Sequence, residues 1–434
     1  MSYIGSTPTT QSFISGTDYF NGTGSQTAFT LSRNVASVND VEAVVNNVVQ
    51  RPNDAYTISG TTITFTSAPS AGTSNIYVRY LSTTTQSITP SQNTVSYATW
   101  DNDLRNETFA FKNRLINGAT GIWQRGTSFT SVGNGVSAPQ YTADRIFGYR
   151  GSGWTANLDI TQQTGFGQYQ NCLRAQRTSG TSSTAVMVIG QIIESVNMYD
   201  LQGQSVTLSF NCRAGSNFSG GTLAPQIYFS TAANQTSASL AIGTWTGSTS
   251  VGTTITPTTT ATQYTFTAAV PSNALSMGVI FVWTPSGTAG ANDFLEFAGI
   301  QLEKGSTATS FDYRPYGTEL ALCQRYYQRF TANTTGSPGD GGVATFANWS
   351  GNSGYAGFVF PVQMRAAPTG SSSGGSTFTY LSNGAARNPV TLDLANSSNN
   401  RIELIATWST SLTGGNAAWL RIDTNGWLAF SAEL

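Results

Sequence analysis

The chain has 434 residues, 39% of them hydrophobic, which is enough for about three domains that each bury a core. It has no histidine, only 9% charged residues and a formal net charge of −1. Because histidine is the side chain that titrates near neutrality, its absence excludes Ser-His and Cys-His nucleophilic pairs, His-ligated metals and imidazole acid-base catalysis, so we expect a binding or structural protein and no enzyme.

The charge pattern and hydropathy exclude two classes of partner. Only two lysines occur, Lys112 and Lys304, and no cluster of basic residues is present, whereas binding to a phosphate backbone needs several convergent cations. The longest apolar stretch, around residues 277–283, is too short to span a bilayer. The first residues lack the basic and apolar segments of a signal peptide. We therefore expect no nucleic-acid partner, no membrane insertion, and folding in the cytoplasm.

The cysteines indicate neither a disulfide framework nor a metal site. Cys172, Cys212 and Cys323 lie far apart, they are odd in number, and no Cys-x-x-Cys motif occurs. We expect buried free thiols that pack as small hydrophobic residues.

Residues 1–90 consist of short β-branched and aromatic runs separated by turn residues such as Pro52, Asn53 and Asp54. This pattern predicts a compact β-sandwich. The expected strands are residues 28–31, 41–49, 56–58, 62–65 and 76–81.

Residues 91–118 differ in composition, because serine and glycine become rare and apolar residues recur at helical spacing. The apolar positions are Tyr97, Trp100, Leu104, Phe111 and Leu115. This spacing predicts a helical linker over about residues 93–117. Its narrow apolar stripe either packs on the N-terminal domain or forms the seam of a trimeric coiled coil.

Residues 119–316 alternate short strands with polar turns, which is typical of a two-sheet sandwich or jelly roll. The clearest strands are residues 185–193, 205–212, 225–229, 262–266, 278–283 and 294–302. Trp123, Trp154, Tyr169 and Trp245 lie in or near loops. They are candidates for ligand contact, although half-buried aromatic residues often only anchor loops.

Residues 317–434 begin with a short helical turn at 319–323 and continue as a last β-domain. Trp408 shares a strand face with Ile402 and Leu404, so we place it in the core. The loop Thr424-Asn425-Gly426, with Gly426 left-handed, predicts a terminal hairpin.

This hairpin register separates two sets of side chains. Trp419, Arg421, Asp423 and Trp427 fall on one face. Leu420, Ile422, Leu428 and Phe430 fall on the other, which we expect to be the core face. Exposed tryptophans require a partner, and three remain open: a neighbouring subunit, a glycan, or local packing.

Three groups of motifs resemble segments of bacteriophage tail-fibre proteins. The first resembles the virion-proximal β-domain: YFNG at 19–22, AFTL at 28–31, NNVVQ at 46–50, DAY at 54–56 and ITFTSAP at 63–69. The second is similar to the closing strand of carbohydrate-binding-module-like jelly rolls: FAGIQLEKG at 297–305 and SFDYRP at 310–315. The third resembles a distal receptor-binding tip: LCQRYY at 322–327, FPVQMRAAPT at 360–369 and SAEL at 431–434.

The resemblance implies serial β-sandwich and jelly-roll domains in a homotrimeric virion appendage, assembled in the host cytoplasm. Residues 1–90 would attach to tail adaptor or nozzle proteins, and the distal domains would bind a host surface polysaccharide. Such jelly rolls often hold a structural calcium ion, for which Glu303 and Asp312 are candidate ligands; no other cofactor is implied.

Two alternative functions remain open. One is a structural head fibre or neck connector without a specific ligand. The other is a polysaccharide depolymerase, which needs two carboxylates facing each other across a cleft. The acid pairs that could be proposed are Asp293 with Glu296, Glu194 with Asp200, and Asp393 with Glu403, yet no motif singles out any of them.

Overall fold

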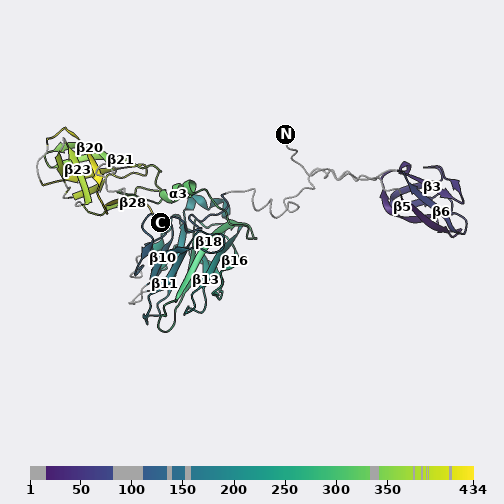
Figure 1. The fold of residues 1–434 in the computed structure, drawn as a ribbon, viewed down its shortest axis with the longest axis horizontal. Helices are drawn as coiled ribbons and strands as arrows, with labels where there is room; N and C mark the ends of the chain where they lie inside the picture. The colour runs from purple at the N-terminus through teal and green to yellow at the C-terminus, as the bar shows by residue number, and fades with distance from the viewer. Residues whose placement is uncertain are drawn as a thin grey trace. The chain divides into compact units, whose positions relative to one another are not determined.

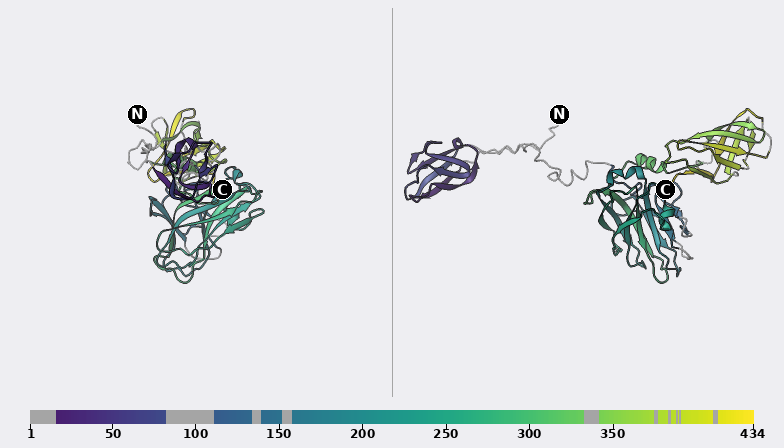
Figure 2. Two further views of the ribbon diagram at one scale, coloured as in Figure 1. Left: turned by 90° about the vertical axis from the view of Figure 1, so that its right-hand side faces the viewer. Right: turned by 180° about the vertical axis from the view of Figure 1, so that it is seen from behind.

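The computed structural model describes residues 16–81, 111–133, 139–151, 158–332, 342–374, 377–382, 385–387, 389, 391–409 and 413–434. In these residues the protein is mainly β, with several antiparallel sheets and two short α-helices, α2 (Ser237–Ala241) and α3 (Tyr316–Gln324). The chain divides into two compact units, Met1–Trp100 and Asp101–Leu434. Figure 1 shows the strands of each unit, and Figure 2 shows them from two further sides. The mainly β class predicted from the sequence is confirmed.

The N-terminal unit is a small two-sheet sandwich. One sheet has the order β1-β6-β3-β4, from β1 (Thr17–Gly22), β6 (Gly72–Tyr80), β3 (Val41–Val45) and β4 (Val48–Val49). The other pairs β2 (Ala28–Val35) with β5 (Tyr56–Phe65). Side chains of both sheets share one core. The strand expected at 41–49 is broken by Asn46 and Asn47, whose φ angles of 49° and 63° make the two-residue turn between β3 and β4.

The middle of the chain is a sandwich of two six-stranded sheets. The front sheet has the order β16-β13-β18-β11-β10-β7. Its strands are β16 (Thr262–Ala269), β13 (Ser205–Ala214), β18 (Phe294–Lys304), β11 (Asn171–Arg177), β10 (Leu158–Thr164) and β7 (Ser128–Phe129). Figure 1 labels β10, β11, β13, β16 and β18 of this sheet.

The back sheet has the order β15-β14-β17-β12-β9-β8. Its strands are β15 (Thr249–Gly252), β14 (Ala224–Ser230), β17 (Ser276–Trp283), β12 (Met187–Ile193), β9 (Phe147–Arg150) and β8 (Gln140–Tyr141). From β11 onward the chain repeatedly crosses between the two sheets, as in a jelly roll. Aromatic contacts fill the space between them: the Phe281 ring lies 4.8 Å from Phe210 and 5.0 Å from Phe297.

The predicted helical linker is not helical in the residues that the structure describes. Tyr97, Trp100 and Leu104 lie outside the described residues. Residues 111–118 contain no helix; Phe111 has a φ of 64°, and Leu115 is buried in the core of the middle sandwich. The prediction is therefore wrong for this segment, and Leu115 cannot belong to a trimer seam.

The physical reason lies in the pairing of this segment with β18. The Arg114 amide donates to the Leu302 carbonyl (2.7 Å), and the Asn113 side chain bonds the main chain of both Ile300 and Leu302 (3.0 Å each). These bonds replace those of a helix, so Leu115 points into the sandwich although its spacing is helical.

The C-terminal sandwich contains a seven-stranded and a three-stranded sheet. The larger has the order β24-β23-β27-β20-β21-β26-β25. Its strands are β24 (Ala385–Arg387), β23 (Phe378–Ser382), β27 (Ala417–Ile422), β20 (Gly342–Ser350), β21 (Ser353–Val359), β26 (Arg401–Thr407) and β25 (Thr391–Ala395). The smaller joins β19 (Tyr327–Thr331), β28 (Trp427–Ser431) and β22 (Thr369–Ser372). Helix α3 contains the helical turn predicted at 319–323, and Trp408 is buried as predicted.

The predicted terminal hairpin is wrong. β27 pairs with β20 and β23, whereas β28 pairs with β19 and β22, so the two strands belong to different sheets. The left-handed residue is Asn425, with a φ of 66°, and Gly426 is not left-handed. Both sheets nevertheless cover one core, which is why the predicted core face is buried. Its members are Leu420, Ile422, Leu428 and Phe430.

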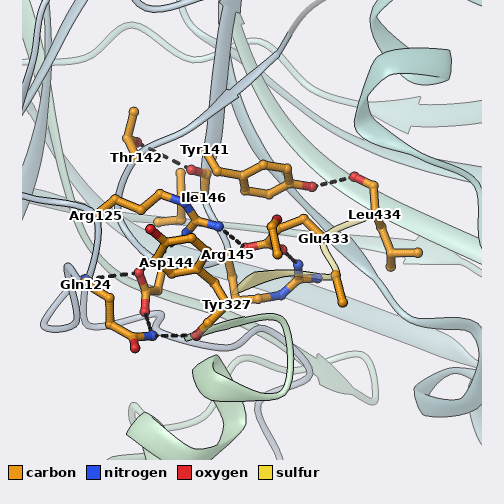
Figure 3. A network of polar contacts seen from close by, with 12 residues as sticks. Gln124, Arg125, Tyr141, Thr142, Asp144, Arg145, Ile146, Tyr327, Glu433 and Leu434 are labelled. Carbon is orange, nitrogen blue, oxygen red and sulfur yellow. Dashed lines mark hydrogen bonds and ion pairs between the residues drawn. The ribbon is translucent and has the colours of Figure 1, made fainter. Parts of the chain in front are cut away.

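The last two residues of the sequence pack on the middle sandwich (Figure 3). The Glu433 carboxylate accepts hydrogen bonds from the buried Arg145 guanidinium and from Arg125 (3.0 Å). Leu434 lies in an apolar cluster on the back sheet, and its main-chain oxygen accepts from the Tyr141 hydroxyl. The end of the sequence is therefore tied to strands and loops almost 300 residues earlier.

Asp144 is a buried acid beside this network (Figure 3). Its carboxylate accepts from the Gln124 amide (3.1 Å) and lies 3.5 Å from the Arg125 guanidinium. Burial raises the pKa of Asp144 to about 6, and the attraction of Arg125 offsets only part of this effect.

No helix among the described residues has the length and apolar character needed to cross a membrane.

We predict that Asp144→Asn changes the pH dependence of stability. The folded chain keeps Asp144 protonated up to about pH 6, whereas the unfolded chain releases this proton near pH 3.8. The folded state therefore loses stability as the pH rises between these values, and the variant lacks this loss. In urea denaturation, the free energy of unfolding of the variant relative to the parent should rise by about 2–3 kcal/mol from about pH 4 to about pH 7. A difference that stays constant with pH would contradict this assignment.

Candidate functional site

A candidate site in the described residues is a groove on the outer face of the front sheet. It has a volume of about 540 Å³, within the range of small-molecule sites in proteins. It is lined by Phe166, Gly167, Gln168, Tyr169, Asn211, Ala261, Gln263, Ala308, Thr309, Ser310 and Phe311. These residues come from β13, β16, the turn between β10 and β11, and the segment after β18.

Tyr169 forms one wall of the groove because β18 lacks a side chain at Gly299. A Cβ atom at Gly299 would lie 2.1 Å from the Tyr169 hydroxyl oxygen, and Gly299 has a φ of 60°. The register between β13 and β18 shifts at this point, between Ser209 and Asn211. Glycine is favoured at this bulge for two reasons: it adopts the left-handed conformation without strain, and it has no side chain to block the Tyr169 ring. Tyr169 is thereby only 7% exposed although it lies on the outer face.

Amide side chains surround the Tyr169 hydroxyl. Asn211 Nδ2 donates to it at 3.1 Å, and Gln168 Nε2 donates at 3.2 Å. Gln263 lies directly opposite Asn211 on the neighbouring strand and is exposed. Burial raises the pKa of Tyr169, so its hydroxyl keeps its proton. The groove therefore presents uncharged donors and acceptors.

Aromatic rings form the apolar part of the groove. The Phe311 ring meets Tyr169 edge-on, with the ring centres 5.4 Å apart, and Phe166 is half-buried at the same site. Flat apolar faces beside amide groups suit a ligand that carries both C–H surfaces and hydroxyl groups.

A second hollow of about 350 Å³ adjoins the groove at Gln168, which lines both. Two exposed tyrosines belong to it: Tyr313, which is 53% exposed, and Tyr316, which is 69% exposed. The Tyr313 ring stacks on Tyr169 with the ring centres 6.1 Å apart, and its hydroxyl donates to the Gln168 carbonyl at 2.9 Å. The second hollow therefore continues the surface of the groove.

A buried carboxylate between two arginines lies on the same sheet face. Glu296 on β18 is 0% exposed and faces Arg174 on β11 and Arg213 on β13. Arg174 donates from Nε (2.8 Å) and Nη2 (2.6 Å), and Arg213 donates from Nε. The Arg213 guanidinium also lies over the Phe166 ring, 4.9 Å from its centre. These contacts fix both arginines relative to the groove.

Of the four aromatic residues singled out in the middle domain, the structure places only Tyr169 in the groove. Trp245 is buried, donates to the Thr236 carbonyl (2.9 Å) and packs on the back sheet, so its candidacy for ligand contact is wrong. Trp123 is half-buried and donates to the Thr120 carbonyl (2.7 Å), as a loop anchor does. Trp154 lies outside the described residues.

The candidate residues of the C-terminal sandwich do not form one platform. Trp419 is 57% exposed on β27, whereas Trp427 is half-buried on β28 beneath the Arg329 guanidinium. Arg421 Nε pairs with Asp423 at 2.9 Å. The two tryptophans belong to different sheets, so they cannot stack side by side along one hairpin as the sequence suggested.

Glu303 and Asp312 do not fit a calcium site. Both Glu303 carboxylate oxygens accept hydrogen bonds from Thr309, and one of them also accepts from Gln301. The Asp312 carboxylate accepts a hydrogen bond from the main-chain amide of Asn113 and lies 3.8 Å from the Arg314 guanidinium. In the part of the chain that the structure describes, no three acidic or cysteine side chains converge, whereas calcium needs six or more oxygen ligands.

Most of the acids considered for catalysis are held by arginines. Asp293 pairs with Arg177 at 3.0 Å, Glu194 with Arg325 at 2.8 Å, and Asp200 with Arg114 at 2.6 Å. Asp393 and Glu403 lie on adjacent strands but face Ile405 and Ala395 instead of each other. The three cysteines are free and buried, as expected.

The sequence reasoning missed most of the groove, although a signal was present. The missed residues are Phe166, Gln168, Asn211, Gln263 and Phe311. In β13 and β16, polar side chains alternate with buried or half-buried apolar ones, and this period of two identifies an outer face with polar side chains.

Comparisons with known proteins give only distant similarities. No protein-family model and no curated protein matches the sequence. The chain is similar to the enzymatically active domain of tailspike protein 4 of bacteriophage CBA120, with 14% identity and a TM-score of 0.26, over 45% of this chain and 22% of that one. It is also similar to a CBM4 structure (15%, TM-score 0.24, 44% and 98% covered) and to TmCBM61 in complex with β-1,4-galactotriose (10%, TM-score 0.25, 44% and 99% covered). Similarities this low assign no function.

We predict that Gly299→Ala displaces Tyr169 and lowers stability. The added methyl group would overlap the Tyr169 hydroxyl. The alanine backbone would also have to keep a left-handed φ, which alanine disfavours. The free energy of unfolding should fall by about 3 kcal/mol, measured by urea denaturation. Gly167→Ala, at a positive φ with no atom within 4 Å of the new Cβ, is the matched control and should cost about 1 kcal/mol. Equal effects of the two variants would contradict the close approach.

Proposed function

We propose that this protein binds a carbohydrate through the groove on the front sheet. The observation that carries the proposal is the combination of Tyr169, Phe166 and Phe311 with the amides of Asn211 and Gln263 in one hollow. Sugar rings present C–H faces that pack on aromatic rings, and hydroxyl groups that pair with amides. The uncharged lining suits such a ligand.

The adjoining hollow supports a ligand longer than one sugar. Gln168 lines both the groove and the second hollow, and the second hollow also contains the exposed rings of Tyr313 and Tyr316. Each hollow by itself has the volume of a small-molecule site. A glycan chain that crosses Gln168 would contact both.

We further propose that the groove binds without cleaving. A glycosidase needs two carboxyl groups flanking the bond that it breaks. The residues that line the groove include no aspartate or glutamate. The second hollow is lined by one carboxylate, Glu319, which pairs with Arg314 at 3.1 Å. Glu296 on the same face as the groove is buried with an arginine on each carboxylate oxygen. A carboxylate whose two oxygens are both bonded to arginines is not free to flank a glycosidic bond.

We propose that the chain is a subunit of a bacteriophage tail fibre, on the strength of the three motif groups that resemble such proteins. In this proposal it is a homotrimer, residues 1–90 attach it to tail adaptor or nozzle proteins, and the later β-domains bind a host surface polysaccharide. Weak individual sites would suffice, because several sites on one particle raise the effective concentration.

The groove is tested by replacing its amides. We predict that Asn211→Ala and Gln263→Ala each lower the affinity for a glycan about fivefold, because each removes one neutral hydrogen bond. The measurement is binding of the full chain to a glycan array, followed by titration with the polysaccharide bound most tightly. Gln226→Ala on β14 of the back sheet is the matched control and should leave the affinity unchanged. Equal affinities for all four proteins would sink the proposal.

The assignment to a tail fibre is tested on the virus particle. Antibodies raised against residues 16–81 should label the tail of intact particles in electron micrographs, at the base of radiating fibres. Labelling of the capsid would identify a head fibre, and failure to label any particle would reject the assignment to a virion.

A further inference from the structure

One guanidinium near the groove is held in place and keeps unused donors. Arg213 lies two residues from Asn211 on β13, and its guanidinium covers Phe166, which lines the groove. Its Nε donates to Glu296, while its two terminal nitrogens have no hydrogen-bond partner among the described residues. The side chain is 36% exposed. These nitrogens are therefore available to a ligand.

The charges around the groove differ between its two ends. At the Phe166 end, Glu296 carries one negative charge against the two positive charges of Arg174 and Arg213. At the other end, where Thr207 of β13 pairs with Glu303, the Glu303 carboxylate accepts three hydrogen bonds, from Thr309 and Gln301. The lining residues carry no charge. An anionic group is thus favoured only at the Phe166 end.

The geometry of Arg213 suits a carboxylate in particular. A guanidinium presents parallel N–H groups that match the two oxygens of a carboxylate, and such charge-assisted bonds are stronger than neutral ones. Glu296 and Phe166 already hold the side chain, so little rotational freedom is lost when a ligand binds.

We propose that Arg213 recognises a sugar carboxylate, so that the glycan bound by the groove is acidic and contains a uronic acid among neutral sugars. This inference rests on the proposed carbohydrate function and names the chemical class of its ligand. Neutral sugars occupy the remainder of the groove, where the amides and aromatic rings lie.

The test is binding of the full chain to matched acidic and neutral polysaccharides. The probes are gellan and hyaluronan, each with one uronic acid per repeat, their carboxyl-reduced forms, neutral xylan and dextran, and a wider array of acidic and neutral bacterial polysaccharides. The acidic polysaccharide bound most tightly should lose about tenfold or more in affinity on carboxyl reduction. Arg213→Gln should lower the affinity for that acidic form by a similar factor and leave the reduced form unchanged.

Two controls separate loss of recognition from loss of fold. Arg79→Gln removes an exposed arginine of the N-terminal unit and should change no affinity. If Arg213→Gln fails to fold, the parent chain still supplies the test: rising ionic strength should weaken binding of the acidic form, and the reduced form should be unaffected.

Each outcome decides one of the two proposals. Tightest binding to a neutral polysaccharide, or an acidic ligand whose affinity survives either carboxyl reduction or Arg213→Gln, would overturn the role of Arg213 and leave the carbohydrate function standing. Binding to no glycan at all, or an affinity that Asn211→Ala leaves unchanged, would overturn the carbohydrate function itself.

Discussion

The candidate site depends on the close approach of the Tyr169 ring to the backbone of Gly299. The bulge in β18 creates the left-handed position, and the missing side chain leaves room for the ring. In this position the Tyr169 hydroxyl accepts hydrogen bonds from Asn211 and Gln168, and the Tyr169 ring stacks on Tyr313. The groove and the second hollow therefore share one structural support, the contact between Tyr169 and Gly299 of β18.

The sparse charges of the chain mostly serve its structure. Glu296, Asp293 and Glu194 each pair with at least one arginine, and Glu433 joins the end of the sequence to Arg145. Burying such pairs costs desolvation that their attraction offsets only when the geometry is good, so they fix positions more than they add stability. With these acids paired in this way, the groove is lined by amides, hydroxyls and aromatic rings.

The sequence carried more information about the fold than about the site. Strand periodicity located the six clearest strands of the middle sandwich, and burial of Trp408 followed from its neighbours Ile402 and Leu404. Leu115 misled because an apolar residue at helical spacing can equally fill a sandwich core. The terminal hairpin was predicted wrongly because two strands that follow each other in the sequence, here β27 and β28, can belong to different sheets. The groove brings together Phe166, Asn211 and Phe311, which are spread over about 145 residues of the sequence. No local sequence pattern shows that residues so far apart lie side by side.

In the proposed function, the glycan contacts the front sheet of the middle sandwich. Hydrogen–deuterium exchange of the full chain, with and without a saturating glycan identified on the array, measures this contact. Exchange should slow in residues 165–171, 209–213, 261–265 and 308–316. Slowed exchange confined to the C-terminal sandwich around Trp419, with none in these segments, would contradict it.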